Sequence, residues 1–214
     1  MEESKRNLPL FLFDFDGVIV DTLDEATTTF EIFFKSLGLT PLSKEGVRDL
    51  YNVNKYESLK KLGVPEKSFG DFLDLIIKRN EEGVADVKFY PGTEELLSSL
   101  SQYRKYIITS SSTEAVEKLL EKANLREDFI EVLGADKETS KVKKIDKVLS
   151  QEGVDSNQTY FVTDTTGDII EAKKAGVKTI AVGWGYHPAE RLKKENPDHL
   201  FTSADEFIKA IPGL

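Results

Sequence analysis

The sequence has no cysteine, only 2 histidines and no long apolar run. Without cysteine, the chain has no disulfide, no cysteine nucleophile and no thiolate metal site. No apolar stretch approaches the roughly 18 residues of a membrane-spanning helix. The first residues, MEESKRN, also lack the apolar centre of a signal peptide. We therefore expect a cytoplasmic protein that does not bind a membrane.

Basic residues are outnumbered by acidic ones, 29 to 38, which gives a formal net charge of -9. This balance argues against general affinity for nucleic acid. Glycine and proline are sparse, at 14 and 7 of 214 residues, so a collagen-like or low-complexity chain is excluded. The length suits one or two globular domains and leaves a monomer and a homodimer equally open.

Short apolar runs recur along the chain and predict strands of a parallel sheet that is buried on both faces. Helical patterns separate them from residue 104 onward, beginning at Ser111, near Lys141 and at Asp168. This alternation is typical of a doubly wound, mainly parallel α/β sheet. The predicted strands are residues 8–13, 106–108, 130–133, 160–162 and 179–182.

The segment between the first two predicted strands breaks this alternation. Two apolar stripes at helical spacing, without a convincing strand between them, predict an all-helical insertion. We predict an α/β core domain of residues 1–20 and 89–214 and a helical cap domain of residues 21–88. The stripes are Phe30, Phe33, Phe34 and Leu37, and Phe69, Phe72, Leu73, Ile76 and Ile77.

An acidic segment, DFDGVIVDT, follows the first apolar run and contains Asp14 and Asp16. Side chains two positions apart on an extended chain point the same way, so both carboxylates face a common space. Such a pair repels unless a cation or a shared proton compensates it. Oxygen ligands at the carboxyl end of a strand suit Mg²⁺, and Gly17 permits a sharp turn there.

This segment resembles the first motif of the haloacid dehalogenase-like (HAD) hydrolases, DxDGV followed after two residues by DT or DS. The resemblance implies a Rossmann-like core with a helical cap and an Mg²⁺-dependent phosphoryl transfer. In that family the first Asp is the nucleophile and the second is the general acid and base. Asp14 and Asp16 are the corresponding residues here.

The resemblance extends to the next two motifs of the family. Thr109 in YIITSSS ends the second core strand and corresponds to a phosphate-binding Thr or Ser, with Ser110 beside it. The segment DKETSKVKKIDKVL contains the lysine that neutralises nucleophile and phosphate. Lys141, at the expected helix start, matches best, and Lys144 is the alternative.

The segment YFVTDTTGD corresponds to the acidic fourth motif, commonly GDxxxD, with Thr163 in place of the usual glycine. We expected Thr163 to narrow the space beside the metal. The metal ligands that the resemblance implies are Asp14, Asp16, Asp164 and Asp168.

The chain is therefore expected to be a phosphatase that releases phosphate from a small metabolite. Its tail after residue 182 resembles members of the phosphoglycolate phosphatase type. Arg48 and Lys55, in the most polar and basic part of the cap, are the candidate substrate-binding residues there. The alternatives are a phosphomutase, a phosphonatase with Lys55 as a Schiff base, a phosphorelay receiver domain, and a phosphoacceptor or binding protein without turnover.

Overall fold

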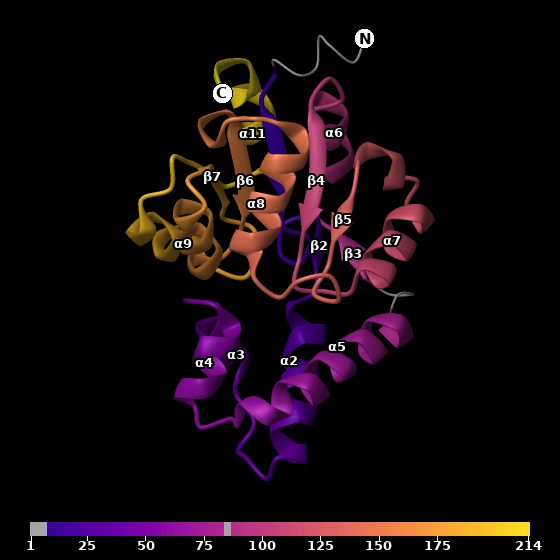
Figure 1. Ribbon diagram of the computed structural model, residues 1–214, viewed down its shortest axis with the longest axis vertical. Coiled ribbons are helices and arrows are strands. Elements are labelled where there is room, and N and C mark those ends of the chain that lie inside the picture. The colour runs from indigo at the N-terminus through magenta and orange to yellow at the C-terminus, as the bar shows by residue number, and fades with distance from the viewer. Residues whose placement is uncertain (1–7, 84–86) are drawn as a thin grey trace.

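A six-stranded sheet with the strand order β5-β4-β1-β6-β7-β8 forms the centre of the computed structural model, which describes residues 8–83 and 87–214 (Figure 1). Every neighbouring pair in it is parallel. The sequence-based expectation of a doubly wound parallel sheet is therefore confirmed. The strands are β1 Leu10–Phe13, β4 Arg104–Ile108, β5 Val132–Leu133, β6 Thr159–Thr163, β7 Lys178–Val182 and β8 His199–Phe201.

Strand β1 lies between β4 and β6, and its side chains alternate between two apolar layers. Phe11 and Phe13 pack against α6, α7 and α11, whereas Leu10 and Leu12 pack against α8 and α9. Full burial of each of these side chains contributes about 1.5–3 kcal/mol. The alternation continues at Asp14, which points to the same face as Leu12, toward α8 and α9. The core helices are α6 Thr93–Ser99, α7 Thr113–Lys122, α8 Lys141–Glu152, α9 Thr166–Lys174, α10 Ala189–Leu192 and α11 Ala204–Ala210.

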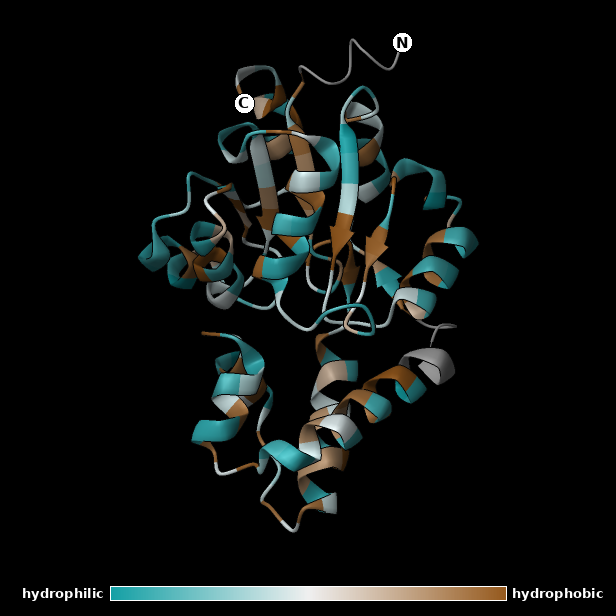
Figure 2. Cartoon of the chain, in the orientation of Figure 1, coloured by the Kyte–Doolittle hydropathy of each residue, from teal (hydrophilic) through white to brown (hydrophobic). Residues whose placement is uncertain are grey.

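A separate group of helices, here called the cap, lies beyond the carboxyl ends of the strands (Figure 1). Its apolar side chains, among them Phe30, Phe33 and Phe72, form a core of their own. Figure 2 shows the hydrophobic residues that recur along the longest of these helices, α5. The cap helices are α2 Leu23–Ser36, α3 Lys44–Leu50, α4 Lys55–Lys61 and α5 Phe69–Gly83.

The sequence predicted the stripes of α2 and α5 but neither α3 nor α4, which have 7 residues each. A helix of two turns is too short to display a clear apolar period. Side-chain caps begin both helices, because Ser43 accepts a bond from Gly46 and Asn54 accepts one from Tyr56. An antiparallel pair of two-residue strands, β2 Val20–Asp21 and β3 Lys88–Phe89, was also missed; it joins the two ends of the cap. Residues 1–7 of the predicted core and 84–86 of the predicted cap lie outside the described residues.

Several predicted element boundaries were wrong, and β1, for example, begins at Leu10 and not at residue 8. Helix α7 is capped by Ser112, which accepts a hydrogen bond from Ala115, and not by Ser111. Helix α9 begins at Thr166 behind the cap residue Thr165, ahead of the predicted start at Asp168. Strand β4 begins at Arg104, two residues before the predicted start at residue 106. The charges of Arg104 and Lys105 hid this part of the strand from the apolar pattern, and the buried Arg104 pairs with Glu152.

Strand β5 is shorter than predicted, and β8 was not predicted at all. Ile130, at the predicted start of β5, is 53% exposed and precedes the strand. Strand β8 contains His199 and is only partly buried, so it lacks the apolar run of a central strand. Short 3-10 turns complete the chain at Glu66–Ser68, Arg126–Asp128, Ser156–Gln158, Lys193–Glu195 and Ile211–Gly213.

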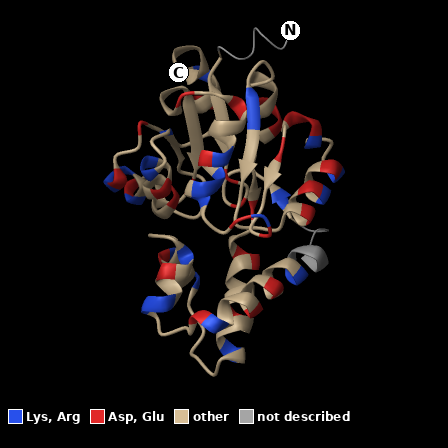
Figure 3. Ribbon diagram, viewed as in Figure 1, with Lys and Arg blue, Asp and Glu red and all other residues tan. Residues whose placement is uncertain are grey.

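Acidic and basic residues are interspersed along the helices of both regions (Figure 3). Within the described residues, no helix has the length and apolar character that crossing a membrane requires.

Candidate active site

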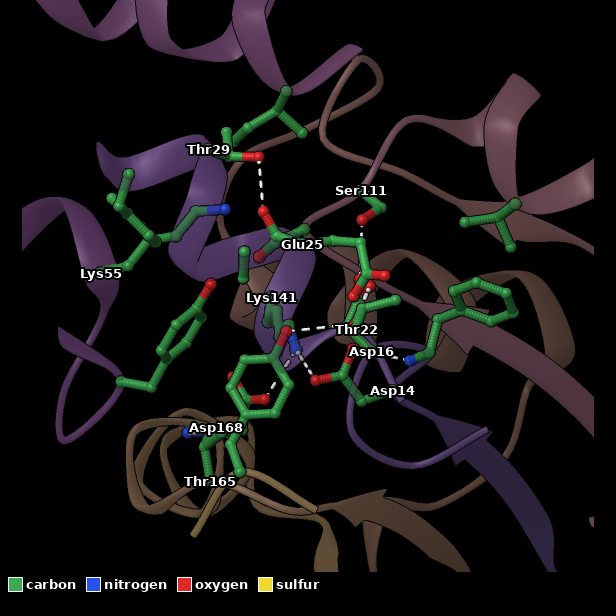
Figure 4. Close-up of a pocket in the computed structure, with 18 of the residues that line it drawn as sticks. Asp14, Asp16, Thr22, Glu25, Thr29, Lys55, Ser111, Lys141, Thr165 and Asp168 are labelled. Atoms are coloured by element: carbon green, nitrogen blue, oxygen red, sulfur yellow. Dashed lines mark hydrogen bonds and ion pairs between the residues drawn. The ribbon is translucent and has the colours of Figure 1, made fainter. Parts of the chain in front are cut away.

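Polar residues from several segments meet where β1, β4 and β6 end, at the edge of the sheet nearest the cap. Asp14 follows β1, Thr109 follows β4, Asp164 follows β6, and Lys141 begins α8. Parallel neighbouring strands end at the same edge, which is where open α/β sheets bind their ligands. A cavity between this edge and the cap is lined by Asp14, Asp16 and Lys141 (Figure 4).

Lys141 bridges two carboxylates at the base of this cavity. Its Nζ donates to Oδ2 of Asp14 at 2.6 Å and to Oδ2 of Asp168 at 2.7 Å (Figure 4). Burial alone would lower the pKa of Lys141, but the two carboxylates raise it well above the usual range for lysine. Burial raises the pKa of Asp14, and the Lys141 cation opposes that rise. The site therefore contains a fixed cation in contact with the predicted nucleophile.

Lys144, the alternative to Lys141, has a different environment. Its Nζ donates to the carbonyl oxygens of Thr109 at 2.6 Å and Gly134 at 3.3 Å. Burial lowers the pKa of Lys144 to about 7, with a further contribution from the nearby Lys141 cation. Lys144 does not line the cavity. Its contacts instead connect the loops that follow β4 and β5.

Asp16 is held by three hydroxyl groups. Its Oδ1 accepts from Thr22 at 2.8 Å, and its Oδ2 accepts from Ser111 at 2.6 Å (Figure 4). Oδ2 also accepts from Thr109 at 3.3 Å. The next residue, Gly17, has a φ of 79°, and a Cβ there would lie 1.9 Å from Oδ2 of Asp164. The turn after Asp16 therefore requires glycine, as the sequence suggested.

Asp164 is fully buried, with 0% of its surface exposed. Its Oδ2 accepts the Tyr186 amide at 2.6 Å, but its Oδ1 has no hydrogen-bond partner among the described residues. Burial raises the pKa of Asp164 to about 7. A buried polar atom without a partner typically costs about 1–3 kcal/mol, so this oxygen is suited to a cation.

The oxygen donors present fit a hard divalent ion such as Mg²⁺, and Asp14 and Asp164 are the residues that could hold it. The two residues follow adjacent strands, since the Asp14 amide donates to the carbonyl of Val162 at 2.9 Å. The predicted ligands other than Asp164 all accept hydrogen bonds from side chains: Asp14 from Lys141, Asp16 as described, and Asp168 from Lys141 and from Thr163 at 3.0 Å. Among the described residues, Asp164 is therefore the predicted ligand with a buried carboxylate oxygen that has no partner.

In the part of the chain that the structure describes, no three acidic or histidine side chains form a ready metal cluster. Water and substrate oxygens would have to complete the coordination, which is common for Mg²⁺. Thr163, the departure from the family motif, does not simply fill space beside the predicted ligands. Its hydroxyl holds Asp168 in place.

Lys55 contributes an unusual cation from the cap. Its side chain is only 6% exposed, lines the cavity and points into it (Figure 4). Among the side chains that the structure describes, those of residues 8–79 and 87–214, no carboxylate forms a salt bridge with Lys55. Its Nζ lies 5.5 and 5.7 Å from the ring centres of Tyr56 and Phe72. Burial lowers the pKa of Lys55 to about 8.

The other predicted substrate-binding residues have differing positions. Arg48 does not line the cavity, and its guanidinium instead lies 3.0 Å from Glu45, which also pairs with Arg191 of the core. Thr109 is buried behind the cavity, whereas Ser110 and Ser111 line it. The structure therefore brings together every predicted residue except Arg48, with Thr109 reaching the site through Asp16.

Residues that the sequence reading did not assign hold the cap against the core. Gly167 donates its amide to the carbonyl of Tyr51 at 2.9 Å, and a Cβ at Gly167 would lie 2.6 Å from the Val53 carbonyl oxygen. His187 is fully buried; its Nδ1 accepts the Thr166 amide at 3.1 Å and its Nε2 contacts the Arg48 carbonyl at 2.8 Å. The only sequence signal for them was the position of Gly167 inside the fourth motif.

Residues 11–182 match the haloacid dehalogenase-like hydrolase family. The chain belongs to this family. The resemblance expected from its four motifs is thus confirmed, as is its grouping with phosphoglycolate phosphatase-like members.

Several curated relatives are named phosphoglycolate phosphatase, and two of them illustrate the similarity. The protein from Synechococcus elongatus is 23% identical over 205 residues, covering 95% of this chain and 97% of the relative. The protein from Pseudomonas syringae pv. tomato is 28% identical over 219 residues, covering 95% of this chain and 79% of the relative. Among solved structures, that of a predicted phosphatase from Clostridium acetobutylicum has a TM-score of 0.84 at 23% identity, covering 97% of this chain and 100% of that one.

Proposed function

We propose that this protein hydrolyses the phosphate monoester of a small metabolite with the help of Mg²⁺, through an aspartyl-phosphate intermediate on Asp14. The observation that supports this most directly is the contact of Asp14 with the buried Lys141 cation at the base of the cavity. A carboxylate beside a fixed cation and beneath an enclosed space is suited to attack phosphorus.

Family membership and the phosphatase relatives already identify the chain as a phosphatase of the haloacid dehalogenase-like type. The proposal adds the chemistry: which atom attacks, which group moves the protons, and which residues hold the metal and the substrate.

In the first step, a carboxylate oxygen of Asp14 forms a bond to phosphorus and the bond to the ester oxygen breaks. Asp16 gives its proton to the departing alkoxide, which leaves as the alcohol. The three hydroxyl donors fix the direction in which Asp16 presents its carboxyl group. Lys141 and the polar groups of Ser110 stabilise the charge on the transferring oxygens.

In the second step, Asp16 accepts a proton from water as the water oxygen attacks phosphorus. The bond from phosphorus to Asp14 then breaks, inorganic phosphate is released and the Asp14 carboxylate is restored. Mg²⁺ held by Asp14 and Asp164 would neutralise charge on the phosphoryl oxygens in both steps. Asp168 acts through Lys141, whose ammonium it positions. Thr163 in turn donates a hydrogen bond to Asp168.

The cap supplies Lys55, which we assign to the leaving group. A buried ammonium without a carboxylate partner is well suited to bind a polar or anionic group of the substrate. Contacts such as that of Tyr51 with Gly167 keep the cap over the site, so water is restricted during the first step.

The intermediate can be tested by replacing the proton-transfer group. With p-nitrophenyl phosphate the leaving group departs without needing a proton, so the Asp16→Asn variant should complete the first step and stall before the second. We expect a burst of about one nitrophenolate per protein molecule. Intact-mass spectrometry of the quenched sample should detect the phosphorylated chain.

The control is the double variant Asp14→Asn, Asp16→Asn, which should give neither the burst nor the mass change. A burst that persists without the Asp14 carboxylate would contradict the proposed nucleophile. Wild-type steady turnover by Asp16→Asn would contradict the role given to Asp16.

A further inference from the structure

Apolar side chains line one end of the active-site cavity, here called the apolar lobe. They come from the cap helices α2 and α5, from the segment before β3 and from the core helix α7. The same cavity includes Asp14 and Ser110, so the lobe is continuous with the reacting centre. The lobe consists of Ala26, Phe30, Ile76, Val87, Val116 and Leu119.

The apolar lobe lies between the cap and the core, and residues of both regions line it. Ile76 and Val87 are only partly buried and line the cavity, although they lie beside the apolar cores of the cap and of the sheet. Val116 and Leu119, which also line the cavity, belong to α7 of the core. Polar groups border it on the α2 side, where Nε of Arg79 donates to Thr29 at 3.2 Å.

Glycolate, the alcohol that phosphoglycolate releases, has two carbons, a hydroxyl and a carboxylate. It has no apolar surface to match this lobe, and Lys55 alone would satisfy its carboxylate. If the substrate were small and fully polar, it would leave the lobe empty of apolar groups, and the lobe would stay in contact with water. Apolar surface buried by a bound ligand contributes favourably in proportion to its area.

We propose that the substrate of this phosphatase is a monoester whose alcohol carries an apolar chain or ring that occupies the apolar lobe. This inference rests on the proposed function and adds the substrate class to it. The phosphoryl group would lie at Asp14 and Lys141, and the apolar part would extend between α5 and α7.

A series of n-alkyl phosphates tests the inference, because their ester bonds are chemically alike and only the chain length differs. The kcat/KM measured by phosphate release should rise about fourfold for each methylene that the lobe buries, or about 15-fold from ethyl to butyl phosphate. Phosphoglycolate should be a poorer substrate than butyl phosphate. A flat series, or a preference for phosphoglycolate, would overturn the inference.

Two matched variants on α5 locate the effect. Ile76→Ser should reduce the gain from ethyl to butyl phosphate, whereas Ile77→Ser should not, because the equally half-buried Ile77 does not line the cavity. Ile76→Phe, which fills the lobe, should slow hexyl phosphate more than ethyl phosphate and serves if Ile76→Ser fails to fold. Equal chain-length dependence in the wild type and in a folded Ile76 variant would refute the assignment.

The outcomes separate this inference from the function on which it rests. If all alkyl phosphates are hydrolysed at equal rates that depend on Asp14, the substrate class is wrong and the phosphatase chemistry stands. If neither these esters nor p-nitrophenyl phosphate is hydrolysed, both proposals fail.

Discussion

The sheet edge and the cap wall that face each other across the cavity hold their charged groups in opposite ways. At the sheet edge, Asp14, Asp16 and Asp168 all have short contacts to donors. On the cap wall, Lys55 is buried beside aromatic rings and has no carboxylate partner among the side chains that the structure describes.

This difference separates two tasks within one site. A dense network fixes the groups that must meet phosphorus in one geometry, whatever the substrate. A buried cation without a partner lowers the free energy of unfolding of the free protein. A ligand that supplies the partner restores this free energy when it binds. Changes at the sheet edge should therefore affect the chemical step, and changes at the cap should affect substrate binding.

The largest effect is expected at the sheet edge, from Asp14→Asn. The amide cannot attack phosphorus, so turnover of p-nitrophenyl phosphate should fall by about 10⁴-fold or more. Circular dichroism should show an unchanged fold, because the new side chain has nearly the same shape. Activity close to the wild-type value would contradict the assignment of Asp14 as the nucleophile.

Metal removal should have the next largest effect. EDTA should stop turnover and Mg²⁺ should restore it, because the metal would neutralise charge on the phosphoryl oxygens. The proposed site includes Oδ1 of Asp164, a buried oxygen that has no partner among the described residues. Binding also has a readout independent of activity: Mg²⁺ at 100 times its Kd stabilises the fold by about 2.7 kcal/mol, or about 5–10 °C in Tm. The Asp164→Asn variant should lose this shift, whereas Asp205→Asn, at an exposed position of α11, should keep it. Retention of the shift in Asp164→Asn would argue against this ligand.

Lys55→Met tests the cap wall. Loss of one charge-assisted contact of about 1.5–3 kcal/mol should lower kcat/KM by about 10- to 100-fold, mainly through KM. The free variant should melt at the same or a higher temperature, because a buried unpaired charge has been removed. Lys61→Met, at an exposed position of the same helix, is the control. A loss confined to kcat would place Lys55 with the chemistry instead.

The smallest effect is a pH dependence of the cap. The pKa of Lys55 is lowered to about 8, so its ammonium is charged below that pH and neutral above it. The kcat/KM, which reports the free enzyme, should therefore fall as the pH rises through 8, by up to about tenfold per unit. In Lys55→Arg this fall should disappear, because arginine stays charged. An identical alkaline limb in both proteins would assign it to another group.

Much of the core site could be predicted because its geometry is local. Asp14 and Asp16 lie at the end of an apolar strand, and neighbouring parallel strands end at one edge of a sheet. The order of the motifs along β1, β4 and β6 was therefore enough to predict that the motif residues lie together. The same logic placed Lys141 at the start of α8 behind the cap residue Ser140.

The sequence left Lys144 open as an alternative to Lys141, because both lie on one helix. Only the packing of this helix against the sheet directs Lys141 to Asp14 and Lys144 to two carbonyl oxygens. Arg48 and Lys55 read alike as basic residues of the cap, yet the packing of α3 and α4 directs them apart.

By itself, the sequence determined five of the strands and the acidic residues that follow β1 and β6, since these depend on neighbours along the chain. Only the tertiary structure decided which side chains enclose the cavity. The bond from Ser111 to Asp16 spans 95 positions and the wall of the apolar lobe joins two regions, and contacts of that range leave no periodic pattern in a sequence.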